Sequence, residues 1–328
     1  MSSLDGPIFV TGAGGFIGGR VVEVLEGLPN VSVKASVRRW SSAARIGRLP
    51  VEIVLCDITD ADQVRRAMDG VACVVHCAYG DRHTTVDGTR TVLQAALEAG
   101  TKRVVHLSTM EVYGDVGGEV CEDVPLRKDG SAYRDSKIDA ELLCRDYLER
   151  GLPVSILRPT IVYGPFSTVY TVGFAERLMV GGSFPASEDC QGTCNLLYVD
   201  DLVAAILLAL TRQEAVGEAF NVNGEERLTW WEYLNSLAGA IGLPPLNGGR
   251  SLVQRVRLAA LPQARRLTRA LLNRFEGPIM ALYRGNVVAQ RLMRRGERIL
   301  RGAPSADERR LFKRKVFLPV GKAGRLLG

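Results

Sequence analysis

The sequence has no apolar run long enough to cross a membrane. Its longest apolar stretches, such as residues 202–210, fall far below the roughly 18 residues that a membrane-spanning helix needs. The first residues also lack a basic region followed by an apolar one, so no secretory signal is expected. These two absences predict a cytoplasmic protein.

Metal ligands and regularly spaced cysteines are scarce. The chain has three histidines and seven cysteines, an odd number with irregular spacing, which is typical of free thiols in a reducing compartment. Cys190 and Cys194 form a C-x3-C pair, but no other cysteine or histidine stands at metal-ligand spacing from it. We therefore expect no metal site.

The charges are distributed unevenly along the chain. Residues 1–249 carry 22 basic and 32 acidic residues, whereas residues 250–328 carry 20 basic and 4 acidic ones. Within 250–301 there are 13 arginines, no lysine and two glutamates. Such a basic helical region can cap a substrate lobe and bind a diphosphate, or it can make peripheral contact with an anionic membrane. Nucleic-acid binding is not expected, because only two aromatic residues lie in this segment.

The first half of the chain alternates short β-branched runs with helical segments. This order predicts an α/β fold, a Rossmann-type doubly wound parallel sheet whose strands are apolar because helices cover both faces. The expected strands are 8–12, 31–38, 51–57, 72–78, 103–108 and 153–159, and the expected helices are 16–27, 60–69, 84–99 and 132–150.

The pattern loosens after residue 160, which predicts a second, smaller α+β lobe. We expect residues 1–165 to form the dinucleotide-binding domain, with 195–222 returning to it. Residues 166–194 and 223–328 are expected to form a substrate-binding lobe that includes the basic helical C-terminal region. Thr229 is a candidate N-cap for the helix that begins with Trp230 and Trp231.

A glycine-rich segment, "TGAGGFIGG", directly follows the first expected strand and opens the first expected helix. Gly12 permits a tight turn, Gly15 lets the backbone approach a pyrophosphate, and Gly18 allows the helix to pack closely on the strand. The amides of Phe16 and Ile17 would then point at the phosphates of a dinucleotide.

The end of the second strand indicates which nicotinamide cofactor binds. Val37 stands where an acid would otherwise bind the ribose 2′-hydroxyl, and Arg38 and Arg39 follow it. An arginine fork suits the 2′-phosphate of NADP, so NADP is favoured over NAD. Asp57 and Ile58 follow the third strand and Ala78 follows the fourth, so we expect them to line the cofactor site. Asp57 could equally cap the next helix.

The segment "AYRDSK" places Tyr133 and Lys137 at i and i+4 on one face of a helix. An ammonium one turn away would favour the phenolate and lower the pKa of the tyrosine. Such a tyrosine can exchange a proton with a carbinol or carbonyl oxygen during hydride transfer. Thr109, at the end of a strand, can hydrogen-bond the same oxygen.

These segments together resemble the extended short-chain dehydrogenase/reductase family, which includes nucleotide-sugar epimerases, dehydratases and ketoreductases. The resemblance implies that Thr109, Tyr133 and Lys137 are catalytic and that Pro159 to Gly164 lie along the nicotinamide. It also implies a homodimer, here through 84–99 and 132–150. It spans about residues 7–243 and rests on "TGAGGFIG", "HLSTMEVYG", "AYRDSK", "LRPTIVYGP" and "LLYVDDLVAAI".

Two residues depart from the family pattern. Thr160 stands where sugar epimerases often have an asparagine, and Met110 stands where 4,6-dehydratases have the aspartic acid that protonates a leaving hydroxyl. A thioether cannot donate that proton, so Met110 favours redox chemistry at one carbon over elimination. We expect Glu111, Thr160 and Asn195 to face the substrate, with Glu111 serving as a base or pairing with an arginine.

The sequence therefore predicts an NAD(P)-dependent enzyme acting on a secondary alcohol or ketone of a nucleotide-activated sugar, as a 4-epimerase or 4-ketoreductase. One alternative is an NADP-dependent reductase of a hydrophobic ketone, of the dihydroflavonol or 3β-hydroxysteroid kind. Another is a regulator that binds NADP without turnover.

Overall fold

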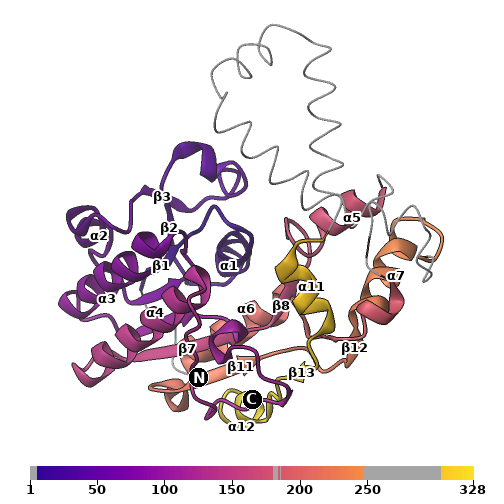
Figure 1. Ribbon diagram of the computed structural model, residues 1–328. Helices are drawn as coiled ribbons and strands as arrows, with labels where there is room; N and C mark the ends of the chain where they lie inside the picture. Colours follow the sequence, from indigo (N-terminus) through magenta and orange to yellow (C-terminus); the bar gives the residue numbers. More distant parts are fainter. Residues whose placement is uncertain (1–5, 180–183, 185, 247–303) are drawn as a thin grey trace, which may run out of the picture. The chain divides into compact units, whose positions relative to one another are not determined.

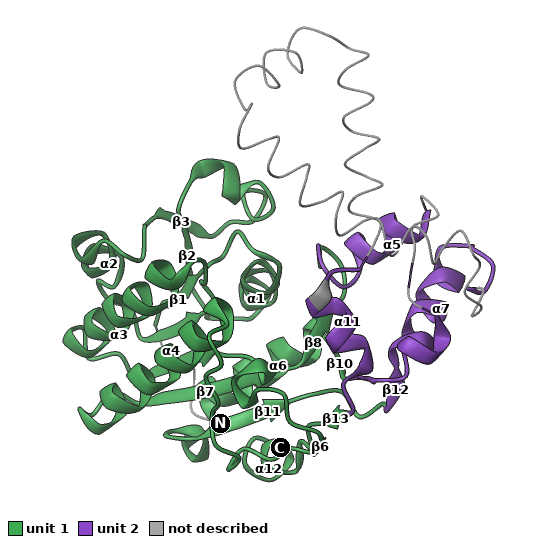
Figure 2. Cartoon of the chain, viewed as in Figure 1, with its two compact units in different colours: residues 1–167, 195–226, 316–328 green, residues 168–194, 227–315 purple. Residues whose placement is uncertain are grey.

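The structure is a computed structural model, and it describes residues 6–179, 184, 186–246 and 304–328. These residues form two compact units (Figure 2): unit 1 comprises the described residues of 1–167, 195–226 and 316–328, and unit 2 comprises those of 168–194 and 227–315. The basic segment 250–301 that the sequence analysis singled out lies outside the described residues.

Unit 1 is built on a seven-stranded sheet in the order β11-β7-β5-β4-β1-β2-β3 (Figure 1), and every pairing in it is parallel. This confirms the predicted doubly wound sheet, since the order reverses beside β1. The strands are β1 (Ile8–Thr11), β2 (Val33–Val37), β3 (Glu52–Leu55), β4 (Cys73–His76), β5 (Arg103–Leu107), β7 (Val154–Pro159) and β11 (Ala219–Val222).

Helices cover both faces of this sheet, because alternate strand residues point to opposite sides. Ile8 and Val10 of β1 pack in one apolar core, and Phe9 between them packs in the other. The first core includes α1 (Phe16–Glu26), α6 (Val199–Thr211) and α12 (Gly321–Leu326), and the second includes α2 (Ala61–Ala67), α3 (Gly88–Glu98) and α4 (Ala132–Glu149). A π-helical turn, η2 (His83–Asp87), leads into α3.

Short elements complete unit 1. The strand pairs β8 with β10 and β6 with β13 are both parallel. Their bounds are β6 (Gly118–Glu119), β8 (Ile161–Tyr163), β10 (Leu196–Tyr198) and β13 (Val316–Phe317), and the short helical turns are η1 (Trp40–Ala43), η3 (Met110–Tyr113) and η5 (Gln213–Ala215).

Unit 2 contains α5 (Val172–Met179), η4 (Ser187–Asp189), α7 (Trp230–Ala240), α11 (Ala306–Lys313) and the antiparallel pair β9 (Thr193–Cys194) and β12 (Leu228–Thr229). Its described core is aromatic, with the ring of buried Trp230 5.0 Å from that of Phe312. The predicted N-cap is confirmed, since the Thr229 hydroxyl accepts from the Glu232 amide in a capping box.

The division into units differs from the prediction at residues 166–167, 223–226 and 316–328, which belong to unit 1. Residues 316–328 belong to unit 1, not to the second lobe, because β13 pairs with β6 and Leu327 packs in the first core. The role of unit 2 as a substrate lobe stays a prediction.

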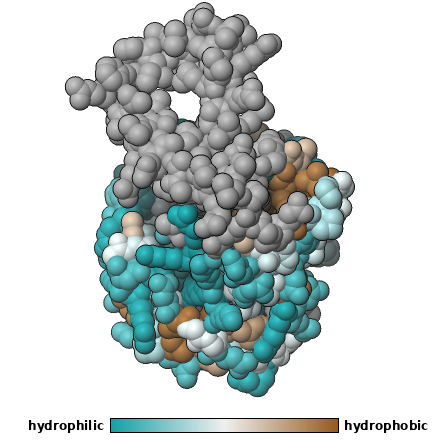
Figure 3. Space-filling view, turned by 45° about the vertical axis from the view of Figure 1, so that its right-hand side comes forward, coloured by the Kyte–Doolittle hydropathy of each residue, from teal (hydrophilic) through white to brown (hydrophobic). Residues whose placement is uncertain are grey.

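Two further observations concern the described part of the chain. It has no helix that is long and apolar enough to span a membrane, and no group of three metal-ligating side chains within it could hold a metal ion. On the face drawn in Figure 3 the described surface is chiefly hydrophilic, with separate apolar patches.

Candidate active site

The glycine-rich turn connects β1 to α1 with very little space around it. Gly12 has a φ of 66°, in the left-handed region, and a Cβ there would lie 2.9 Å from the Ala78 backbone. A Cβ on Gly18 would lie 2.4 Å from the Gly12 carbonyl oxygen. The predicted packing reasons for Gly12 and Gly18 are therefore present in the structure.

The amino end of α1 is suited to a diphosphate. Gly15 is its N-cap with an extended backbone, no side chain caps the helix, and no acidic residue stands in the first turn. The positive end of the helix dipole and the first amides, those of Phe16 and Ile17 included, are thus left to a ligand rather than to the protein's own side chains. This arrangement fits a dinucleotide cofactor.

The residues expected around the adenosine follow the ends of the neighbouring strands. Arg38 is exposed, as is Arg39. The Asp57 carboxylate accepts from the amide and hydroxyl of Thr59 at 3.0 and 2.8 Å, and Asp60, not Asp57, caps α2. The alternative role of Asp57 as a helix cap is therefore wrong, because the helix begins one turn later.

Ile58 and Ala78 are held by close backbone contacts. A Cβ on Gly88 would lie 2.6 Å from the Ile58 Cδ1, so Ile58 packs directly on the start of α3. The Ala78 amide donates to the Thr11 hydroxyl at 3.2 Å, which joins the ends of β4 and β1. Their contact with a cofactor stays a prediction.

Thr109 and Tyr133 come together from the end of β5 and the first turn of α4. Tyr133 lies within hydrogen-bonding reach of the Thr109 side chain. Lys137, one turn further along α4, is buried, and its Nζ donates to the Leu107 carbonyl oxygen at 2.8 Å. The structure thus brings the three predicted catalytic residues to the carboxyl end of β5, where ligands bind in such sheets.

The electrostatics of this group differ from the expectation. Desolvation raises the pKa of Tyr133 above its ordinary value, although the Thr109 hydrogen bond opposes the change. Burial in turn lowers the pKa of Lys137 to about 8. The prediction that Lys137 lowers the pKa of Tyr133 is wrong for this structure, because the ammonium is directed at the β5 backbone rather than at the phenol.

The sequence analysis missed Tyr79, which directly follows Ala78. Its ring lies edge-on to that of Tyr133 with centroids 6.1 Å apart, and the Lys137 Nζ is 5.6 Å from the Tyr79 ring centroid. The Tyr79 side chain is 64 % exposed and that of Tyr133 44 %. An aromatic residue just after the fourth strand was the available signal.

Met110 and Glu111 begin η3 directly after Thr109. Met110 is buried, and the Glu111 carboxylate pairs with the Arg134 guanidinium at 3.2 Å. Arg134 also contacts Asp129 and Asp115. Of the two roles considered for Glu111, the structure shows pairing with an arginine.

Thr160 and Asn195 belong to a buried polar cluster that follows Pro159 at the end of β7. The Thr160 hydroxyl donates to the Asn223 side-chain oxygen at 3.0 Å, and the Asn223 amide donates to the Asn195 oxygen at 3.2 Å. Asn195 also donates to the Val316 carbonyl oxygen at 3.0 Å. These bonds give both predicted substrate residues a structural role, and their contact with a substrate stays a prediction.

Comparison with known proteins decides the family. The sequence profile of the NAD dependent epimerase/dehydratase family matches residues 8–223. The chain belongs to this family. It is 35 % identical over 260 residues to a dTDP-glucose 4,6-dehydratase of Streptomyces griseus, covering 72 % of this chain and 78 % of that protein.

Other relatives of this epimerase/dehydratase-family enzyme bear different names. It is 26 % identical to a 2-alkyl-3-oxoalkanoate reductase of Shewanella oneidensis, over 84 % of this chain and 76 % of that protein. The crystal structure of a dTDP-glucose 4,6-dehydratase from Streptomyces venezuelae, with NAD bound, matches with a TM-score of 0.65 at 30 % identity, over 73 % of this chain and 82 % of that one.

A cavity of about 720 Å³ in unit 1 lies away from these residues. It is lined by α4, α12, and the first residues of β7 and β11, such as Val154 and Ala219. Because those are the amino ends of the strands, this cavity is at the opposite end of the sheet from Thr109. This cavity is therefore not the candidate active site, although it is large.

Two buried histidines lie near the carboxyl ends of β4 and β5. His76 and His106 are paired across β4 and β5, with ring centroids 5.3 Å apart. His76 bonds Thr11 at 2.7 Å and Thr89 at 3.0 Å, whereas neither ring nitrogen of His106 has a partner among the described residues. Burial lowers the pKa of His76 to about 3 and that of His106 well below its ordinary value.

We expect the enzyme to lose stability in acid because of these two imidazoles. A depressed folded pKa means that the unfolded chain binds more protons, so the stability is present above pH 6.5 and is lost as the pH falls toward 3. Each imidazole changes the free energy of unfolding by up to roughly 1.4 kcal/mol for each pH unit between its unfolded and folded pKa values. The measurement is urea unfolding of the wild type and of His106→Phe at pH 7.5 and 5.

The matched control for this prediction is His83→Asn. His83 is exposed, and Asp87 raises its pKa, so removing it should not reduce the acid-dependent loss. An unchanged pH dependence in His106→Phe would show that His106 does not titrate in this way.

Proposed function

We propose that the enzyme oxidises or reduces a single secondary alcohol or ketone carbon of a nucleotide-activated sugar, as a 4-epimerase or 4-ketoreductase that uses NADP. The observation that carries this proposal is the Thr109 and Tyr133 pair at the end of β5, with Lys137 buried behind it and the apolar Met110, not an acid, directly after Thr109. The bound nicotinamide would supply or accept the hydride.

The residues of this chain would handle the proton. During reduction the neutral Tyr133 hydroxyl gives its proton to the carbonyl oxygen, and during oxidation the Tyr133 phenolate takes a proton from the carbinol oxygen. The Thr109 hydroxyl, held at the start of η3, bonds the same oxygen and orients it. Lys137, whose pKa burial lowers to about 8, donates to the Leu107 carbonyl oxygen and so helps to hold the end of β5 next to Thr109.

The contacts of Met110 and Glu111 support redox chemistry over elimination. An elimination needs an acid at the leaving hydroxyl, and the Met110 thioether carries no acidic proton. Glu111 is engaged by Arg134 at 3.2 Å. We therefore propose that this chain does not share the dehydratase activity named for its Streptomyces relatives.

The names of relatives support two substrate classes. Nucleotide sugars are favoured by the dTDP-glucose 4,6-dehydratases, at 35 % and 33 % identity in two Streptomyces species. A hydrophobic ketone is the second candidate, because a putative dihydroflavonol 4-reductase of Synechocystis is 29 % identical and the exposed Tyr79 ring adds an apolar wall beside Tyr133.

Mass spectrometry of the purified protein distinguishes an epimerase from a reductase by whether a dinucleotide is retained. An epimerase returns its hydride to the same substrate, so retained dinucleotide would support an epimerase. A protein that is purified empty and binds NADP from solution would support a reductase. A protein that neither retains nor binds a dinucleotide would contradict the proposal altogether.

Cofactor choice gives a direct prediction at Arg38. Arg38→Ala should weaken NADP at least tenfold more than NAD, because only NADP carries a 2′-phosphate and a charge-assisted contact contributes roughly 1.5–3 kcal/mol. The measurement is cofactor titration by calorimetry. Arg65→Ala, which removes an exposed arginine of α2, is the matched control and should change neither affinity. Equal losses for both cofactors in Arg38→Ala would remove Arg38 as the selector.

Two assembly features remain proposals. The homodimer would form through the surfaces of α3 and α4, the elements that correspond to predicted helices 84–99 and 132–150. Peripheral membrane contact through 250–301 would be tested by sedimentation with anionic and neutral vesicles at low salt.

A further inference from the structure

The segment between β2 and β3 lies directly against the glycine-rich turn. We name residues 39–49 the strap. Its Ala43 and Ile46 side chains are buried in the first core, and a Cβ on Gly14 would lie 2.3 Å from the Ser42 carbonyl oxygen. The absence of a side chain at Gly14 therefore lets the strap pack against the glycine-rich turn, since any side chain there would displace it.

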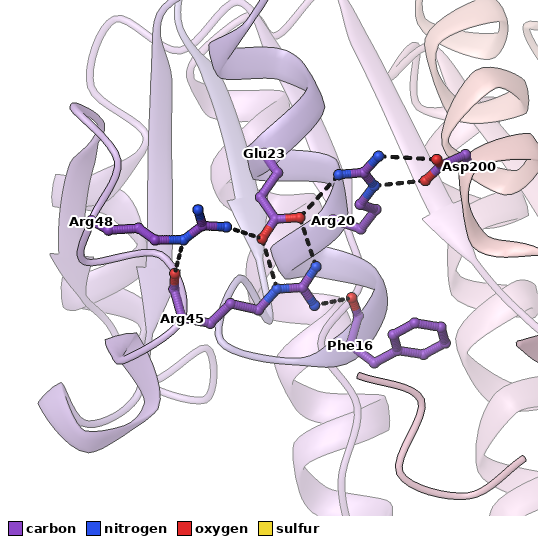
Figure 4. A network of polar contacts seen from close by, with 6 residues as sticks. All are labelled: Phe16, Arg20, Glu23, Arg45, Arg48 and Asp200. Atoms are coloured by element: carbon purple, nitrogen blue, oxygen red, sulfur yellow. Dashed lines mark hydrogen bonds and ion pairs between the residues drawn. The ribbon is translucent and has the colours of Figure 1, made fainter. Parts of the chain in front are cut away.

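One side chain of the strap, Arg45, reaches across α1 (Figure 4). Its Nε and Nη2 donate to the two carboxylate oxygens of Glu23 at 2.9 and 2.8 Å, and its Nη1 donates to the Phe16 carbonyl oxygen at 2.9 Å. A Cβ on Gly19 would lie 3.2 Å from the Arg45 Cδ, so this glycine leaves room for the side chain. The contact joins the strap to the helix that begins at the phosphate-binding turn.

The Glu23 carboxylate holds this contact together. Its side chain is nearly buried, and the hydrogen bonds from Arg45 are the main reason that its pKa is lowered to about 2. Arg48, also in the strap, donates to Glu23 at 3.0 Å. The carboxylate therefore stays ionised at neutral pH and pairs there with both strap arginines, of which Arg45 is nearly buried and Arg48 is largely exposed.

Arg45 has little capacity left to bind a ligand itself. All three of its guanidinium nitrogens donate within the protein, the group lies 4.2 Å from the centroid of the Phe166 ring, and its side chain is 12 % exposed. Bidentate pairing of this kind fixes orientation as well as distance. Arg38, immediately before the strap, and Trp40 within it are both exposed.

We propose that Glu23 and Arg45 are positioning residues for the cofactor: together they clamp the strap onto the glycine-rich turn and so fix the adenosine side of the dinucleotide site. Neither residue touches the dinucleotide. The inference rests on the proposed cofactor-dependent function, and it assigns to α1 a second task besides presenting its amides to the diphosphate.

The test compares cofactor affinity in three variants by calorimetry, with NADP and NAD as probes. Glu23→Gln removes the charge that holds Arg45. Gly19→Ala, whose Cβ would lie 3.2 Å from the Arg45 side chain and also 3.2 Å from the Ala13 carbonyl oxygen, crowds both Arg45 and the glycine-rich turn without changing any charge. We expect each to weaken whichever cofactor the wild type prefers by roughly five- to twentyfold, an indirect effect that is smaller than the loss of a direct charge-assisted contact. Trp40 fluorescence should change in both, which reports movement of the strap.

Asp200→Asn is the matched control. Asp200 pairs with Arg20 at 2.6 Å in the same network but does not touch the strap, so this variant should bind cofactor within about twofold of the wild type. Equal weakening by Asp200→Asn and Glu23→Gln would reduce the network to a general role in folding and overturn the inference.

The remaining outcomes are also decisive. Tighter binding of NADP by Glu23→Gln would mean that the freed Arg45 binds phosphate directly, which contradicts a positioning role. If both Glu23→Gln and Gly19→Ala bind the cofactor as tightly as the wild type, Glu23 and Arg45 do not position it, and the proposed function is unaffected. A wild type that binds neither cofactor would overturn the proposed function, and the inference with it.

Discussion

Replacing Tyr133 by phenylalanine should lower turnover by about 10²–10⁴-fold, the usual contribution of a positioned proton donor. The hydroxyl that lies within reach of Thr109 is lost, while the ring and its edge-on contact with Tyr79 are kept. Cofactor affinity should stay within a few-fold of the wild type, because the phosphate-binding turn is not altered. Steady-state kinetics combined with cofactor titration checks both parts.

Tyr79→Phe is the comparison for this variant. It removes a second hydroxyl from the same site, one for which no proton-transfer role is assigned, and should retain most of the turnover. Full activity in Tyr133→Phe would take Tyr133 out of the mechanism. Loss of activity in Tyr79→Phe alone would transfer the role of acid to Tyr79.

The second large effect is expected at Glu141, the partner of a fully buried arginine. The Arg158 Nη2 donates to the Glu141 carboxylate at 2.7 Å, and both side chains are completely inaccessible to solvent. Glu141→Gln leaves the guanidinium without its counter-charge, so we expect a loss of about 3–5 kcal/mol in the free energy of unfolding. Urea unfolding at pH 7.5 measures it.

Replacing the whole pair separates the charge from the packing. The double variant Glu141→Leu, Arg158→Met should be less destabilised than Glu141→Gln alone, because it leaves no uncompensated charge in the core. Greater destabilisation in the double variant would show that the other Arg158 bonds matter more than the ion pair. Those bonds run to the Tyr113 hydroxyl at 2.8 Å and to the Glu122 carbonyl oxygen at 3.1 Å.

This buried network also connects the two elements that position Thr109 and Tyr133. Tyr113 ends η3, the turn that begins next to Thr109, and its hydroxyl donates to the Asn221 side-chain oxygen at 2.6 Å. Glu141 lies on the same helix as Tyr133. The Arg158 contacts therefore connect the turn after Thr109 to the helix that carries Tyr133, so a stable core and the spacing of Thr109 and Tyr133 depend on the same bonds.

The parts of the structure that were predictable from the sequence have local signals. The strands of the main sheet are short β-branched runs, and the turn at Gly12 requires a left-handed backbone that glycine adopts without strain. The i and i+4 spacing of Tyr133 and Lys137 likewise fixes their common helix face. Such features depend on a few neighbouring residues, and the sequence displays them directly.

The features that were missed depend on residues far apart in the chain. Arg45 meets Glu23 across two elements, and the Lys137 Nζ bonds the Leu107 carbonyl oxygen rather than approaching the phenol. Val316 and Phe317 join unit 1 through a two-residue pairing with Gly118 and Glu119. A two-residue strand has no periodicity, and the direction of a long side chain is set by tertiary contacts, so neither is visible in the sequence.

Analysis of the reaction products shows whether the enzyme changes one carbon by oxidation and reduction or also eliminates a hydroxyl group. The enzyme would be incubated with NADP or NAD and a panel of dTDP- and UDP-hexoses, and the products followed by proton NMR. We expect a product that differs from its substrate at a single carbinol carbon and keeps the C-6 hydroxyl. A 4-keto-6-deoxy product would contradict this expectation, because Met110 has no proton to give to the leaving group.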